Sequence, residues 1–118
     1  METKNLIDLV VEALEDLKGQ DIEILDVSDM TTITDAMVIV SGTSSRHVRS
    51  LADDVVMKAK ESGHQPLGVE GEQQGDWILV DLNDVLVHVM LPKVRDFYNL
   101  EKLWKISDVA RRAGQSSL

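Results

Sequence analysis

Hydrophobic residues near the start of the chain recur at steps of three and four positions, the period of an amphipathic helix. The series runs through Leu6, Val10, Ala13, Leu14 and Leu17. Thr3 is expected to cap the start of this helix, and Gly19 to end it in a left-handed conformation. A second series predicts another helix, capped by a serine of residues 41–45 and ended by Gly63. It comprises Val48, Leu51, Ala52, Val55 and Ala59.

Strand patterns occupy the segments between and after these helices. Residues 22–27 alternate, with Ile22 and Ile24 on one side and Leu25 and Val27 on the other. Residues 37–40 are continuously apolar, which is typical of a strand covered on both faces. A brief strand is expected near residues 67–69.

Residues 77–81 and 85–91 form the clearest hairpin, because they flank the turn-prone pair Asn83 and Asp84. With a two-residue loop, Leu82 faces Val85, and counting then divides the side chains between two faces. One face is aliphatic and comprises Ile78, Val80, Leu82, Val85, Val87 and Val89. The other face is mixed and comprises Trp77, Leu79, Asp81, Leu86, His88 and Met90.

The order of these elements predicts an α/β fold, a mixed β-sheet flanked by helices in a single domain at residues 1–106. The two long helices would cover the aliphatic face. Pro92 would end the last strand, and residues 94–104 would form a helical or turn-rich segment. This C-terminal segment is the only one left to cover the mixed face. A short helix is predicted at residues 106–113. Residues 107–118 are predicted to be a basic, partly disordered C-terminal extension.

Composition and charge exclude several classes of function. The chain has 118 residues and no cysteine, so disulfides, thiolate metal sites and cysteine nucleophiles are excluded. The net charge is −9; residues 1–40 contain ten acidic and two basic residues, whereas residues 93–118 contain three acidic and six basic ones. An acidic surface repels a phosphate backbone, so dedicated nucleic-acid binding is not expected, whereas a basic protein partner would be attracted. With no apolar run of membrane-spanning length and no signal pattern, we expect a cytoplasmic protein without membrane contact.

Candidate chemistry is sparse. The three histidines, His47, His64 and His88, lack the spacing of a ligand pair, so no metal site is predicted. The acidic pairs at residues 26 and 29 and at residues 53 and 54 are interpreted as turn formers and solvated charges.

The serine-rich turn from Ser41 to Arg49 offers the alternative function, a small-molecule or nucleotide-binding enzyme. Backbone amides at this strand-to-helix turn could hold an anion, with Arg46 and Arg49 nearby. The simpler interpretation is that Ser41, Ser44 and Ser45 cap the helix, because the nucleophile-elbow and phosphate-loop patterns are absent.

The mixed face of the hairpin supports two interpretations. Its tryptophan, methionine and leucines beside polar residues match the core of a protein interface. Alternatively, the C-terminal segment around Tyr98 covers the face, so that Trp77 belongs to the core and His88 pairs internally with Asp81. The two are compatible if the segment covers only part of the face.

Several blocks of the sequence resemble the ribosomal silencing factor family (RsfS), also called Iojap-like. They are residues 35–48, 68–71, 76–81, 87–89 and 95–104, in register from about residue 3 to residue 104. The resemblance implies a fold similar to nucleotidyltransferases. After Gly42, Thr43 and Ser44, however, the next acidic residues are Asp53 and Asp54 in a helix, so the metal-holding carboxylate pair of those enzymes is missing. The resemblance therefore implies neither an enzyme activity nor a cofactor.

The resemblance also implies a partner and a mechanism. Family members bind a basic protein of the large ribosomal subunit, the one numbered fourteen, at the intersubunit face. They thereby block the joining of the subunits and repress translation during starvation, and the family is linked to late large-subunit biogenesis. We expect the partner-binding residues to be Glu70, Glu72, Trp77, Leu79, Asp81, Leu86, His88 and Met90. The same apolar face would allow a homodimer, and the basic tail a marginal contact with ribosomal RNA.

Overall fold

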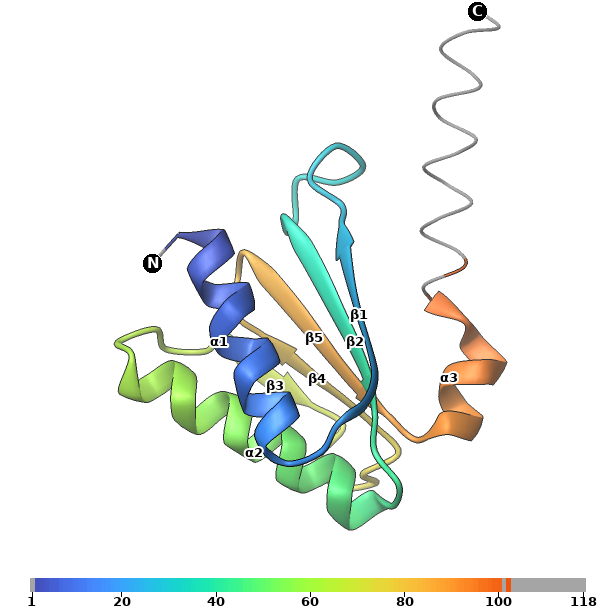
Figure 1. Cartoon of the computed structure of the whole chain (residues 1–118). Helices are drawn as coiled ribbons and strands as arrows, with labels where there is room; N and C mark the ends of the chain where they lie inside the picture. The colour runs from blue at the N-terminus through green and yellow to red at the C-terminus, as the bar shows by residue number, and fades with distance from the viewer. Residues whose placement is uncertain (1, 101, 103–118) are drawn as a thin grey trace, which may run out of the picture.

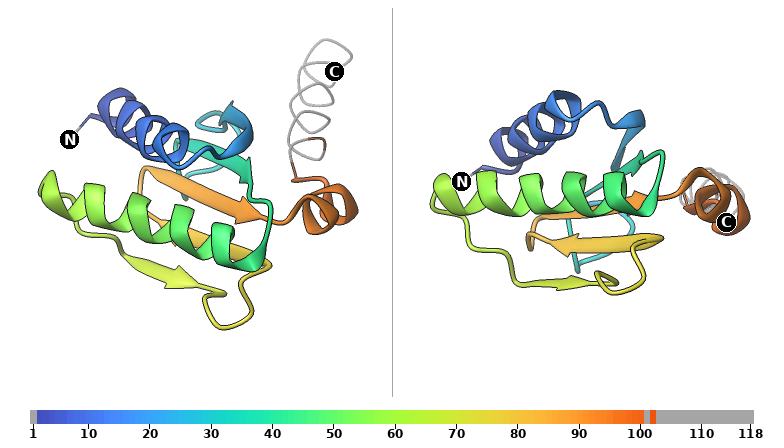
Figure 2. Two further views of the ribbon diagram at one scale, coloured as in Figure 1. Left: turned by 60° about the horizontal axis from the view of Figure 1, so that its bottom comes forward. Right: turned by 90° about the horizontal axis from the view of Figure 1, so that it is seen from below.

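A computed structural model describes residues 2–100 and 102, and within them three helices accompany a five-stranded sheet. The helices are α1 (Thr3–Asp16), α2 (Ser45–Glu61) and α3 (Pro92–Tyr98). The strands are β1 (Gln20–Asp26), β2 (Ala36–Ser41), β3 (Gly68–Glu70), β4 (Trp77–Asp81) and β5 (Val85–Met90). Figure 1 shows α1 and α2 on one side of the sheet and α3 beyond the end of β5; the views in Figure 2 agree. The predicted α/β order and mixed sheet are confirmed.

The strands lie in the order β1-β2-β5-β4-β3. The pair β2 and β5 is parallel, whereas the other three pairs are antiparallel. In the β4–β5 hairpin Trp77 is opposite Met90, and Asp81 is opposite Leu86. The amide of Leu82 donates to the carbonyl of Val85, and Asn83 takes a positive φ of 73° in the two-residue loop. The predicted register is therefore correct.

Two hydrophobic clusters lie on opposite faces of the sheet. The larger one buries the aliphatic face against α1 and α2, and it contains every apolar residue of the predicted α2 series. All six residues of β2 are buried, because this strand has neighbours in the sheet and is covered on both faces. The smaller cluster comprises Leu25, Val27, Met37, Ile39 and Met90, with Met30, Trp77, Leu86, Val94 and Leu100 packed against it.

The predicted ends of α1 are wrong. Glu2, not Thr3, occupies the N-cap position; Thr3 is the first helical residue, and its hydroxyl donates to Asp35 at 3.1 Å. The left-handed residue after the helix is Lys18, with φ 61°. Gly19 is needed for a different reason, since a Cβ there would lie 2.7 Å from a methyl carbon of Val40. The absence of a side chain lets the chain pass close to β2.

The predicted ends of α2 are correct. The hydroxyl of Ser44 accepts a hydrogen bond from the backbone amide of His47 at 3.1 Å, as expected of an N-cap serine. Gly63, just beyond the helix, has φ 80°.

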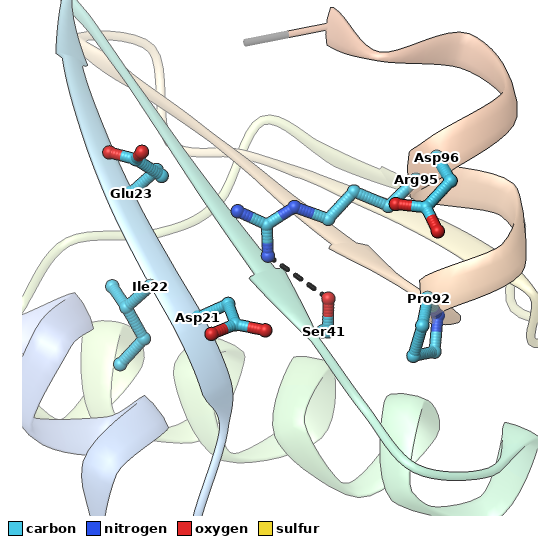
Figure 3. Close-up of a pocket in the computed structure, with 7 residues that line it drawn as sticks. All are labelled: Asp21, Ile22, Glu23, Ser41, Pro92, Arg95 and Asp96. Atoms are coloured by element: carbon cyan, nitrogen blue, oxygen red, sulfur yellow. Dashed lines mark hydrogen bonds between the residues drawn. The ribbon is translucent and has the colours of Figure 1, made fainter.

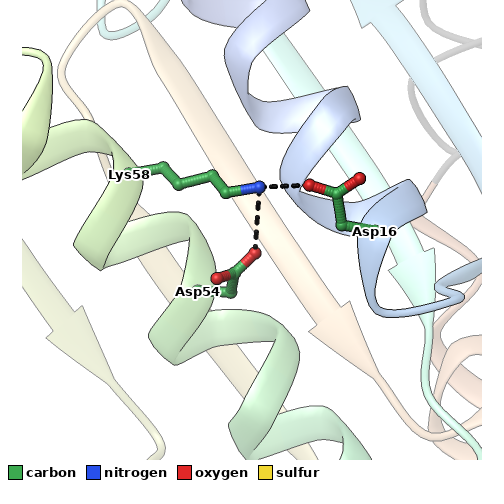
Figure 4. Close-up of polar contacts among 3 residues, drawn as sticks. All are labelled: Asp16, Asp54 and Lys58. Carbon is green, nitrogen blue, oxygen red and sulfur yellow. Dashed lines mark hydrogen bonds and ion pairs between the residues drawn. The ribbon is translucent and has the colours of Figure 1, made fainter.

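Lys58 ties the two long helices together at the surface. Its ammonium group donates a hydrogen bond to Asp16 at the end of α1 and forms an ion pair with Asp54, 3.5 Å away on α2 (Figure 4). The hydrogen bond to Asp16 is the main reason that the pKa of Lys58 lies above its ordinary value. A surface contact of this kind contributes modestly to stability.

The C-terminal helix α3 begins at Pro92 and ends at Tyr98, within the segment predicted to be helical or turn-rich. Asn99 follows with a left-handed φ of 49°, and Leu100 and Lys102 are again helical, so among the described residues of the predicted segment only Asn99 is not. The predicted helix at residues 106–113 and the extension at residues 107–118 lie outside the described residues. In the part of the chain that the structure describes, no helix is long and apolar enough to cross a bilayer.

Candidate functional site

The mixed face of the sheet is arranged in three rows across β4, β5 and β2. The first row joins Trp77, Met90 and Ser41; the second joins Leu79, His88 and Ile39; the third joins Asp81, Leu86 and Met37. Because alternate side chains of a strand share one face, the register brings all six predicted face residues together, with β5 in the centre.

Burial divides these six residues into two groups. Met90 is fully buried and His88 is 6% exposed, so they form the support beneath the surface. Trp77, Leu79, Asp81 and Leu86 are half-buried, and we call these four residues the docking face. Glu70 and Glu72 are exposed, and the register places Glu70 opposite Leu79. The C-terminal helix thus covers part of the mixed face and leaves part of it accessible.

His88 contacts Trp77. The second interpretation, which paired His88 with Asp81, is wrong on this point. The indole N–H of Trp77 donates to Nδ1 of His88 at 3.1 Å. The carboxylate of Asp81 instead accepts from the backbone amide of Asn83. Since Nδ1 accepts, the proton of the neutral imidazole is on Nε2, which is buried and has no hydrogen-bond partner among the described residues.

Stability is expected to fall when the pH is lowered from about 6.5 towards 4. Burial lowers the pKa of His88 to about 4, so the unfolded chain binds a proton first as the pH falls. The contribution of His88 is therefore complete above about pH 6.5 and is lost towards pH 4, by at most about 1.4 kcal/mol per pH unit. Urea unfolding at several pH values measures this slope. A His88→Gln variant should have a flatter profile; equal slopes would contradict the assignment.

Two further aromatic residues extend this surface onto α3. The ring of Tyr98 lies against Trp77, with centroids 4.9 Å apart, and Phe97 lies 5.1 Å from Tyr98. The predicted partner-binding set includes neither residue, since residues 94–104 entered the prediction only as a possible cover for the mixed face. The consecutive aromatic pair just after a proline-started helix was the available signal.

A loop at residues 71–76 fixes the start of β4. Arg49 on α2 donates to the backbone carbonyls of Glu72 at 3.0 Å and Gln73 at 2.7 Å. Gly75 leaves room for this guanidinium group, since a Cβ there would lie 2.9 Å from it. One of the two arginines proposed for an anion site is thus bound to the loop that precedes Trp77.

Four other residues of the serine-rich turn also make structural contacts. The amide of Thr43 donates to Nδ1 of His47 at 2.8 Å, and Nε2 of that ring donates to the carbonyl of Leu17 at 2.7 Å. Ser44 caps α2, and Ser41 accepts from Arg95 at 3.0 Å. The hydroxyls at positions 41 and 44 therefore have structural partners.

The cleft of about 640 Å³ at the start of β1 and the end of β2 is where α3 joins the sheet (Figure 3). Arg95 extends from α3 into this cleft, is 7% exposed and reaches Ser41 on β2. Carboxylates of Asp21, Glu23 and Asp96 also line it. A buried arginine held in this way anchors the short helix.

The acidic pairs behave as turn formers and surface charges. The hydroxyl and the backbone amide of Ser28 both donate hydrogen bonds to the carboxylate of Asp26. These bonds, that of the hydroxyl most of all, hold the pKa of Asp26 below its ordinary value. Asp54 belongs to the contact with Lys58. Among the described residues, no group of three or more histidine or acidic side chains could hold a metal ion.

Comparison with known proteins decides the family. The family described as "Ribosomal silencing factor during starvation" (RsfS) matches residues 1–117. The chain belongs to the ribosomal silencing factor family. A silencing factor of Chromobacterium violaceum is 49% identical over 104 residues, covering 88% of this chain and 85% of the relative. The expected family is confirmed, and with it an association with translation regulation and ribosomes.

A solved structure of high sequence identity has the same fold. A crystal structure of a Chromobacterium violaceum protein superposes with a TM-score of 0.88 at 48% identity, covering 89% of this chain and 88% of the other. A mouse relative, named "Mitochondrial assembly of ribosomal large subunit protein 1", is 35% identical over 103 residues, covering 85% of this chain and 45% of the relative. The mixed α/β fold is thus shown; the similarity to nucleotidyltransferases stays a prediction.

Proposed function

We propose that this protein is a translational repressor that acts by occupying a site on the large ribosomal subunit. It would bind a basic ribosomal protein at the intersubunit face, the one numbered fourteen, and its body would prevent the small subunit from joining. This mechanism requires no chemical step. The observation that carries the proposal is the half-buried Trp77, which His88 and Tyr98 hold in place on the surface of an acidic protein of the silencing factor family.

The docking face has the features of an interface centre. Tryptophan is enriched among the residues that dominate binding energy, especially where the surroundings hold it in one orientation. Here His88 fixes the indole nitrogen of Trp77 and Tyr98 packs on its ring. Leu79 and Leu86 provide adjoining apolar surface. Little conformational freedom would be lost when a partner covers this surface.

Acidic residues beside the docking face favour a basic partner. Glu70 and Glu72 are exposed, and the whole chain carries a net charge of −9. Opposite charges accelerate the encounter of two proteins, and salt screens this attraction. Charge would therefore guide the approach, while the apolar centre would hold the complex.

Sedimentation with separated ribosomal subunits tests the proposal. The protein is expected to migrate with the large subunit and not with the small one, and to bind less as salt is raised. Added to a mixture of both subunits, it should reduce the fraction that forms whole ribosomes. Subunits that join at the normal rate when the large subunit is saturated with the protein would rule out the steric mechanism.

Three further expectations accompany this proposal. A ribosome-bound regulator of this kind would act in the cytoplasm. A role in late large-subunit biogenesis would parallel the name of the mouse relative.

A homodimer through the docking face would compete with ribosome binding, so the dimer fraction measured by analytical ultracentrifugation should fall when large subunits are added.

A further inference from the structure

A groove of about 680 Å³ lies where the start of β4 meets α3. Trp77, Tyr98 and Phe97 bring three aromatic rings to it, and Leu91 and Val94 add aliphatic surface. Tyr98 is 54% exposed and Phe97 is 80% exposed. The chain contains four Phe, Tyr and Trp residues in all, so three of them gather at this one place. We call it the aromatic groove.

A carboxylate without a partner shares the aromatic groove. Asp76 is half-buried, directly precedes Trp77, and has neither a hydrogen bond to its side chain nor an ion pair with any described residue. Its backbone carbonyl, by contrast, accepts from the amide of Leu91. Partial burial of an unpaired charge is unfavourable, and a cation placed against it would relieve the cost.

We propose that the aromatic groove binds an arginine side chain of a protein partner. A guanidinium group is planar, so it can stack on an aromatic face and simultaneously donate two hydrogen bonds to one carboxylate. The groove supplies the aromatic faces, the carboxylate of Asp76 and, at its rim, the amide of Gln74. Lysine has a compact charge without a planar face and fits this combination less well.

This inference rests on the proposed function, because it assigns the arginine to the basic ribosomal protein that binds the docking face. Trp77 belongs to both surfaces, so the docking face continues around the start of β4 onto α3. An arginine in the groove would fix the orientation of the partner, whereas the apolar docking face alone would hold it less selectively.

Lys93 is the one basic residue among the described residues that line the groove. It is exposed and makes no ion pair with Asp76. Its positive charge opposes that of an incoming guanidinium group. Lys93→Ala should therefore strengthen binding of the arginine, and a weaker interaction would contradict the proposed charge of the guest.

A titration without ribosomes tests the groove directly. The probes are N-acetyl-arginine amide and N-acetyl-lysine amide, each added to the ¹⁵N-labelled protein. The arginine probe should shift the Trp77 indole N–H and the amides of Phe97 and Tyr98, and Asp76→Asn should weaken this binding about tenfold. Equal responses to both probes, no response to arginine, or an unchanged response in Asp76→Asn would each overturn the proposal.

A second measurement uses large ribosomal subunits. Asp76→Asn and Phe97→Ala should each lower the affinity. The matched control Asp8→Asn, which removes the same charge from an exposed position of α1, should lower it much less. Equal effects of the two Asp→Asn changes would overturn the assignment to the partner. If the wild-type protein does not bind large subunits at all, the proposed function fails, while the titration still decides whether the groove takes arginine.

Discussion

Replacing Trp77 by alanine is expected to weaken binding to the large subunit roughly thirtyfold, the equivalent of about 2 kcal/mol. The indole is the largest side chain of the docking face, and it is supported from two sides by His88 and Tyr98. Truncation would remove the indole from the proposed contact with the partner, and also the ring against which Tyr98 packs. Binding curves from sedimentation or from interferometry with immobilised subunits measure the loss.

Three controls separate binding from folding in this experiment. Thermal unfolding of Trp77→Ala shows whether the variant is still folded at the temperature of the assay. Met57→Ala removes a 51%-exposed apolar side chain from α2, on the opposite side of the sheet, and should leave binding unchanged. Trp77→Phe keeps an aromatic ring but loses the hydrogen bond to His88, so its affinity should lie between those of the wild type and Trp77→Ala. A folded Trp77→Ala protein that binds like the wild type would remove the docking face from the mechanism.

Gly71→Ala should destabilise the protein by about 3 kcal/mol. Gly71 has φ 89°, a conformation that costs an alanine about 1–2 kcal/mol. In addition, a Cβ at this position would lie 2.1 Å from the backbone oxygen of Trp77, so the loop would have to move, at a typical cost of about 1–3 kcal/mol. Because the clash is with the backbone of β4, no side-chain rotation can relieve it. Urea unfolding measures the change.

Gly63→Ala is the matched control for this variant. Gly63 also has a left-handed φ, 80°, but a Cβ there would have no atom within 4 Å. Gly63→Ala should therefore lower the free energy of unfolding by only about 1–2 kcal/mol. The difference between the two variants isolates the contact with Trp77, and equal losses would show that the loop at residues 71–76 does not constrain the start of β4. Gly71→Ala should also lower the affinity for large subunits, whereas Gly63→Ala should not.

The sequence predicted the elements whose pattern is local and repeated. The hairpin register followed from two strands and one two-residue loop, and the buried face of α2 followed from the spacing of five apolar residues. The division of β1 into two faces was also correct, since Ile22 packs with the larger cluster and Leu25 with the smaller one. In each case one periodicity determines which side chains are buried.

Contacts between distant segments explain what the sequence could not predict. A glycine after a helix usually supplies the left-handed residue, but Gly19 is required by the approach to Val40, 21 positions away, so Lys18 takes the left-handed conformation instead. The pairing of His88 with Trp77 depends on side-chain orientation, since both Trp77 and Asp81 lie two residues from the directly opposite Leu79. The aromatic groove exists only because α3 turns back beside β4.

The parallel pairing of β2 with β5 sets the order in which the chain can fold during its synthesis. Each residue of β2 pairs with one that comes 49 positions later, as Ala36 does with Val85. At about 5–20 residues per second, β2 therefore waits roughly 2–10 s for its second neighbour. Until then the edge of β2 that will pair with β5 has no partner, so we expect the nascent chain to be prone to aggregation until the hairpin is complete.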